Sequence, residues 1–166
     1  MKKLVAAMMI LVASTTALVG CGAQKTNTEV NSNTEAAVEK APLEELLNQM
    51  VEGGAVRMPM PVDETLAQEA YHIDLEVVEE YAIAQTGISP GPGLIVMVKA
   101  KEGQLDQAKA NMEALLEAQV GNAFYPAEQE AAEKAEIIVE GNYVALFILN
   151  DEVKESTVKM FTESTK

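Results

Sequence analysis

The side-chain types that carry most enzyme chemistry are scarce in this chain. Its 166 residues include one cysteine, Cys21, one histidine, His72, and one arginine, Arg57. A lone histidine cannot supply the ligand cluster of a zinc site or the triad of a hydrolase. We therefore expect His72 to be a surface or boundary residue, and we expect the protein to need no cofactor and no metal.

Acidic side chains are abundant and are the remaining candidates for catalysis. The pair Glu79–Glu80 and the group Glu128, Glu130 and Glu133 would bring carboxylates together for acid–base chemistry or for calcium. The sequence lacks the D-x-D-x-D-G loop of a calcium site, and Glu-rich helical faces usually face solvent. The acidic pattern favours a solvated surface over a carboxylate-based hydrolase.

Three residues are weak candidates for binding a ligand. Arg57 would clamp an anion, although a surface ion pair is the commoner role for a single exposed arginine. Tyr125 and Tyr143 would line a small site, although a tyrosine beside a turn or helix end more often packs against its neighbours.

The N-terminus has the layout of a secretory signal. Two lysines, Lys2 and Lys3, precede an apolar run from Leu4 to Ala13, and small and polar residues follow it. The apolar run is shorter than the roughly 20 residues that a membrane-spanning helix needs. We expect residues 1–20 to be a signal peptide.

The residues around Cys21 indicate how the protein is held in place. Leu18-Val19-Gly20-Cys21 resembles the lipobox of bacterial lipoproteins. The resemblance implies cleavage between Gly20 and Cys21, a diacylglyceryl group on the cysteine thiol, and a further acyl chain such as palmitate on the new amine. The alternative is an ordinary signal peptide that leaves a free cysteine. With two or more chains the anchor is stable, which predicts a lipid-anchored protein on the extracytoplasmic face of the cell membrane.

Charge limits the partners of the mature chain. Removal of residues 1–20 takes away Lys2 and Lys3 and no acid, so the formal net charge falls from −14 to −16. Nucleic acid is excluded as a partner, because its binding depends on cationic side chains. We expect the lipid anchor to hold the protein at the membrane and an envelope protein to be its partner. Residues 21–41, polar after the cysteine, are interpreted as a tether.

Residues 42–166 are expected to form a single domain. Apolar spacing predicts helices that begin at Pro42 and Asp63, a long helix from Leu105 to Val120, a short one near 128–134, and a last one from Asp151, the expected N-cap. Strands are predicted at 81–85, 94–100, 137–140 and 143–149, and Gly141-Asn142 suits a two-residue hairpin turn.

This element order predicts the α+β class. We expect a two-layer sandwich with an approximately four-stranded, mainly antiparallel sheet, which carries the long helix and the C-terminal helix on one face. Strands 94–98 and 143–149 are apolar on both faces. The second face is therefore expected to be covered by the N-terminal helices or by another chain.

Two stretches carry a family resemblance. AYHIDLEVVEEYAI (70–83) and FYPAEQEAAEKAEIIVEGNYVALFI (124–148), with the long helix between them, resemble domain-of-unknown-function family 4358, a family of Gram-positive lipoproteins. The resemblance covers roughly residues 66–150 and implies a lipid-anchored, extracytoplasmic domain of unknown role. It supplies no catalytic or binding residues.

The combined expectation is a non-enzymatic binding or interaction module at the cell envelope. The anchor, the scarcity of catalytic groups and the excess of apolar sheet surface motivate it. The alternatives are a small-ligand or cation-binding accessory of a transporter and a carboxylate-based hydrolase.

Overall fold

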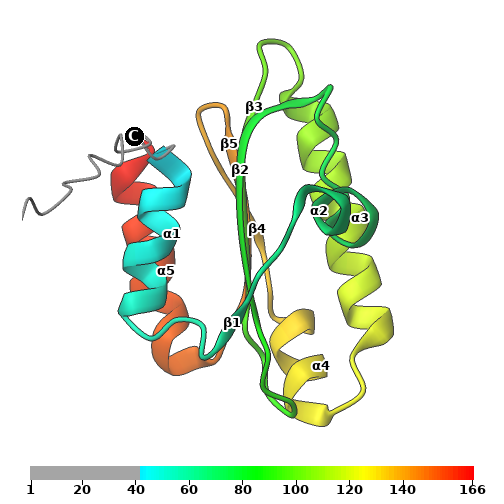
Figure 1. Ribbon diagram of the computed structural model, residues 1–166, viewed down its shortest axis with the longest axis vertical. Helices are drawn as coiled ribbons and strands as arrows, with labels where there is room; N and C mark the ends of the chain where they lie inside the picture. Colours follow the sequence, from blue (N-terminus) through cyan, green and yellow to red (C-terminus); the bar gives the residue numbers. More distant parts are fainter. Residues whose placement is uncertain (1–41) are drawn as a thin grey trace, which may run out of the picture. The chain divides into compact units, whose positions relative to one another are not determined.

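The structure, a computed structural model, describes residues 42–166, in which helices pack on both sides of an antiparallel sheet (Figure 1). The predicted signal peptide, Gly20, Cys21 and the tether lie outside the described residues. The elements in chain order are α1 (Pro42–Glu52), β1 (Pro59–Met60), α2 (Glu64–Tyr71), β2 (Val78–Thr86), β3 (Leu94–Ala100), α3 (Leu105–Asn122), α4 (Pro126–Glu133), β4 (Ile137–Glu140), β5 (Tyr143–Ile148) and α5 (Asp151–Ser164). The predicted α+β class is confirmed.

The sheet has the strand order β1-β2-β3-β5-β4, and every neighbouring pair is antiparallel. The register places Leu94 of β3 opposite Ile148 of β5 at one end of the sheet, and Lys99 opposite Tyr143 at the other. The β4–β5 hairpin turns through Gly141, whose φ of 59° suits glycine, as its sequence predicts. These two ends of the sheet are referred to below as the Leu94 end and the Lys99 end.

Both faces of the sheet are buried. The first core lies between the sheet and helices α2, α3 and α4, and the second lies between the sheet and helices α1 and α5 (Figure 1). Alternate residues of β3 contribute to each: Val96 and Val98 belong to the first core, and Ile95 and Met97 to the second. This explains why β3 and β5 are apolar on both faces, because side chains alternate along a strand.

Two details of the predicted architecture are wrong. The sheet has five strands instead of about four, since Pro59–Met60 adds a two-residue edge strand. The molecule also has three layers instead of two, because α5 lies on the face opposite to α3. The buried residues that precede the two helices differ accordingly: Ala100, before α3, faces the first core, whereas Leu149, which follows β5 and precedes α5, faces the second.

The second face is covered by the chain itself. Helix α1 packs there beside α5, so of the two alternatives an N-terminal helix covers this face within the domain. The other N-terminal helix, α2, packs with α3 on the first face. The excess apolar sheet surface that motivated an interaction partner is therefore buried within the domain.

Helix ends follow local chemistry. Asp63 caps α2, because its side chain accepts a hydrogen bond from the Leu66 N–H at 2.8 Å. The N-cap of α5 is Asn150, and Asp151, the expected cap, is instead the first helical residue. His72 ends α2 with a φ of 57° and is exposed, so it has the surface position expected of it.

Candidate ligand-binding cleft

An open cleft of about 290 Å³ lies at the Leu94 end of the sheet. The loop between β2 and β3 forms one wall, and the end of α3 with the start of α4 forms the other. Its polar lining consists of Gln85, Thr86, Ser89, Gln119, Asn122 and Glu128, and its apolar lining includes Met60, Leu94, Ala132 and Ile148. Elements far apart in the sequence thus meet at one site.

The β2–β3 loop is tied to its surroundings on both sides. The Thr86 hydroxyl donates to the carbonyl oxygen of Arg57 at 2.7 Å, and the Gly87 N–H donates to that of Met58 at 2.9 Å. On the other side, the Gly91 N–H donates to Glu128 Oε1 at 3.0 Å. The loop is therefore fixed in position as one wall of the cleft, since it is hydrogen-bonded both to the segment before β1 and to α4.

Gly93 allows the loop to close tightly against the strand. A Cβ atom at this position would lie 2.8 Å from the Cβ of Thr86, closer than such atoms approach in proteins. The Thr86 N–H also donates to the Gly93 carbonyl at 2.7 Å. A side chain at Gly93 would push the two ends of the loop apart and change the shape of the cleft.

The polar lining is rich in groups that both donate and accept hydrogen bonds. Gln85, Gln119 and Asn122 contribute amides and Ser89 contributes a hydroxyl. The Tyr71 hydroxyl donates to the Gln85 oxygen, which leaves the N–H₂ group of that amide open to other partners. Burial raises the pKa of Tyr71, so this hydroxyl keeps its proton and remains a donor at neutral pH.

Charge is almost absent from the lining. Glu128 is its one carboxylate, and one of its oxygens already accepts from Gly91. Lysine, arginine and histidine do not occur among the lining residues. Within residues 42–166, moreover, no group of three histidine, cysteine, aspartate or glutamate side chains is placed to hold a metal ion. The cleft is suited to an uncharged polar ligand.

Exposed apolar side chains occur on the segments next to the cleft lining. Phe124 follows the lining residue Ala123 and is 85% exposed, and Met58, beside Gly87, is 73% exposed. Tyr125 packs edge-on against Phe124, with ring centroids 5.2 Å apart. Large apolar side chains exposed beside a cleft are typical of a binding surface.

The three weak candidates from the sequence lie in different places. Tyr125 precedes α4, and its carbonyl accepts from the N–H of the cleft residue Glu128. Arg57 lies in an adjoining hollow of about 510 Å³, which it shares with Asp151 and Glu152. Tyr143 is at the Lys99 end of the sheet and packs against the second core, away from the cleft. None of the three lines the cleft, although Tyr125 and Arg57 are bonded through their carbonyls to residues that do.

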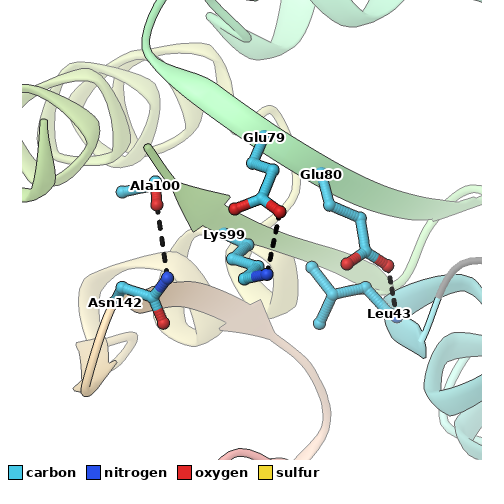
Figure 2. A network of polar contacts seen from close by, with 6 residues as sticks. All are labelled: Leu43, Glu79, Glu80, Lys99, Ala100 and Asn142. Carbon is cyan, nitrogen blue, oxygen red and sulfur yellow. Dashed lines mark hydrogen bonds and ion pairs between the residues drawn. The ribbon is translucent and has the colours of Figure 1, made fainter. Parts of the chain in front are cut away.

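The acidic pair Glu79–Glu80 has structural partners (Figure 2). Glu79 accepts a hydrogen bond from Lys99 at 3.0 Å, which raises the pKa of that lysine. Glu80 accepts from the N–H of Leu43 and so caps the first turn of α1 from the neighbouring strand. The two carboxylates thus hold β3 and α1, and they do not converge on a shared site.

Sequence reasoning missed most of the cleft. Glu128 was interpreted as one of several solvated acids, and the predicted long helix ended at Val120, so neither Gln119 nor Asn122 was singled out. The spacing of three residues, which puts the latter two on one side of a helix, is the one local signal. The proline- and glycine-rich composition of residues 89–93 is typical of a loop, but it gives no sign of the hydrogen bond from Gly91 to Glu128 of α4.

Comparison with known proteins gives a family and no closer relative. No curated protein and no solved structure matches the chain. None of the helices within residues 42–166 combines the length and the apolar character that crossing a membrane requires. The family described as "Domain of unknown function (DUF4358)" matches residues 54–149, which is more than half of the chain and includes both walls of the cleft. The chain therefore belongs to the DUF4358 family.

Proposed function

We propose that the protein is a lipid-anchored, extracytoplasmic binding module whose ligand site is the cleft at the Leu94 end of the sheet. The observation that carries the binding role is the cleft itself, a polar hollow with a firmly held loop, next to which Phe124 follows the lining residue Ala123 and is strongly exposed. Exposing a phenylalanine to water is costly, and a ligand that packs on the ring reduces that cost.

The anchor is supported by the sequence of residues 1–21. An apolar run directly before Leu18-Val19-Gly20-Cys21 is typical of a lipoprotein signal. Two or three acyl chains on Cys21 hold a protein at a bilayer stably, whereas one chain does so only marginally.

A binding role is favoured over catalysis by the lining. General acid–base chemistry needs titratable groups next to the substrate, and the lining offers one carboxylate that is already bonded to the loop. The carboxylate pair that a hydrolase would need is not formed by Glu79 and Glu80, since these residues bond to Lys99 and Leu43. A cation-binding role is disfavoured by the same lining.

The anchor is tested by labelling with a palmitate analogue in cells that produce the full chain or its Cys21→Ser variant. We expect the label and the membrane fraction to contain the full chain, and both signals to disappear in the variant. A chain without label, or a variant that still sediments with membranes, would contradict the anchor.

The binding site is tested by a photo-crosslinking amino acid placed at Phe124 or at Val139 in the membrane-held protein. Both side chains are exposed, but Phe124 directly follows the lining residue Ala123, whereas Val139 lies in the edge strand β4, none of whose residues lines the cleft. We expect an adduct from position 124 and none from position 139. Equal yields at the two positions, or none at 124, would refute the cleft as the binding site.

A further inference from the structure

We infer that the cleft binds an uncharged, hydroxyl-rich ligand of the kind that sugar units present. This inference rests on the proposed binding function and names the chemistry of the ligand. It follows from two properties of the cleft, the type of its polar groups and its lack of cations, and from the exposed aromatic residue that follows the lining residue Ala123.

The polar groups match hydroxyls. Each sugar hydroxyl both donates and accepts a hydrogen bond, and an amide side chain does the same through its N–H₂ group and its oxygen. Gln119 and Asn122 bring two such amides to one hollow, Gln85 adds an N–H₂ group and Ser89 adds a hydroxyl. A ligand that both donates and accepts uses more of these groups than one that only accepts or only donates.

Charge excludes the main alternatives among small ligands. Phosphates and carboxylates are bound more strongly with a cationic partner, which the lining does not provide, and the net charge of −14 repels anions further. A divalent cation needs several oxygen ligands with carboxylates among them, and Glu128 is the only carboxylate in the lining.

An extended peptide is the other ligand that amides recognise, and the sheet disfavours it. A peptide gains most of its main-chain hydrogen bonds by adding to a free strand edge. Beside the cleft the edge strand is β1, which has only two residues. Pro59 and Pro61, within and next to β1, have no N–H to donate to an added strand.

The exposed ring of Phe124, next to the lining residue Ala123, provides a surface for a sugar. The face of an aromatic ring is negatively polarised and attracts the weakly positive C–H groups that line one side of a sugar. Phe124 is 85% exposed, and the Tyr125 ring braces it edge-on. The volume of about 290 Å³ lies at the lower limit of the ~300–1,000 Å³ that is usual for ligand pockets, so it holds a small unit. Because the cleft is open, a chain of such units can continue beyond it.

The test is calorimetric titration of the full chain, purified in a detergent that has no sugar headgroup. The probes are glucose and N-acetylglucosamine, the oligosaccharides cellotetraose and tri-N-acetylchitotriose, and an uncharged alanine–glycine peptide of similar length. We expect saturable binding of at least one sugar probe and none of the peptide. Tighter binding of the oligosaccharides would identify a sugar chain as the source of the ligand, and equal binding a free sugar.

Cleft variants connect the binding to this site. We expect Asn122→Leu and Phe124→Ala each to weaken sugar binding about tenfold, the effect of losing one good contact. Both residues are exposed, so the melting temperature should hardly change. Tyr143→Phe at the Lys99 end is the matched control and should bind like the unaltered chain.

Three outcomes would overturn the inference. They are binding of the peptide in place of sugars, sugar binding that is unaffected by both cleft variants, and no sugar binding at millimolar concentration by a chain that is folded. If crosslinking at position 124 still yields an adduct in any of these cases, the proposed binding function stands and only the ligand class is wrong. If neither sugars nor crosslinks are found, both proposals fail.

Discussion

The contact between Phe147 of β5 and Phe161 of α5 provides a direct test of the second core. Phe147 is 1% and Phe161 0% exposed, and their rings meet edge-to-face with centroids 5.7 Å apart. Replacing either residue by leucine keeps the site apolar but removes the aromatic pair. Each replacement should lower the free energy of unfolding by about 1–2 kcal/mol, from lost buried carbon and imperfect packing.

The double variant separates the contact from the burial. Aromatic pairs contribute about 0.5–1.5 kcal/mol beyond the area that they bury. Because each leucine variant already loses this contribution, the double variant should be destabilised by about 0.5–1.5 kcal/mol less than the sum of the two single effects. Urea unfolding followed by circular dichroism measures all four free energies, provided that the transition slope is unchanged.

Phe124→Leu is the matched control, since the same change at a residue 85% exposed should alter stability by less than about 0.5 kcal/mol. If Phe161→Leu were no more destabilising than this control, α5 would not cover the second face of the sheet. Destabilisation by both core variants with strict additivity would refute the ring contact and leave the layer order intact.

Three further predictions concern the loop, the cap of α1 and pH. Gly93→Ala should lower the free energy of unfolding by about 1–3 kcal/mol, because the added Cβ has no space. Gly121→Ala in α3, where the added Cβ meets nothing within 4 Å, should raise it by about 0.5–1 kcal/mol. Urea unfolding that gave both changes the same sign would contradict this prediction. Glu80→Ala removes the cap of α1 and should lower the free energy of unfolding by about 0.5–2 kcal/mol. Glu79→Ala, which removes an ion pair with a surface lysine, should lower it by about 0–1 kcal/mol. A larger effect at Glu79 than at Glu80 would refute the capping role. Because burial raises the pKa of Tyr71 above its ordinary 10.0, the unfolded chain loses this proton at a lower pH than the folded chain. The free energy of unfolding should therefore fall as pH rises above about 10, by at most about 1.4 kcal/mol per pH unit for this group. Tyr71→Phe should make this fall shallower, and an unchanged slope would refute the assignment to Tyr71.

Local signals in the sequence predicted the elements well. Asp63 before an apolar-periodic segment predicted a capped helix, and Gly141-Asn142 between two β-branched runs predicted a hairpin. Both depend on contacts within a few residues, which a single sequence contains. The same is true of the end of α1 at Gly53–Gly54, where the N–H of Gly53 donates to the carbonyl of Gln49 at 2.9 Å.

The distribution of helices between the two faces could not be predicted in the same way. When a strand such as β3 is apolar on both sides, its pattern fits a helix on either side equally well. The side is settled by contacts that the strand pattern does not contain: Ala100, before α3, faces the first core, and Leu149, before α5, faces the second. This depends on strand register, which the composition of the strand does not determine.

The candidate site was hard to predict for a related reason. Its polar residues come from β2, the β2–β3 loop, α3 and α4, and none of them stands in a recognisable motif. Glu128 illustrates the difficulty, since its partner is the backbone N–H of Gly91, 37 residues away. A backbone donor leaves no trace in residue type, so only the fold reveals the bond.

The position of the cleft in the domain fits the proposed anchor. Residue 42 enters the domain at the Lys99 end of the sheet, because the first turn of α1 is capped by Glu80, the partner of Lys99 in the strand register. The cleft is at the Leu94 end, and the seven residues of β3 that separate the two ends span about 20 Å at ~3.3 Å per residue. Residue 42 and the cleft are therefore at opposite ends of the sheet. A lipid anchor on Cys21 would join the domain at the end that does not carry the cleft, which would leave the cleft free for a ligand.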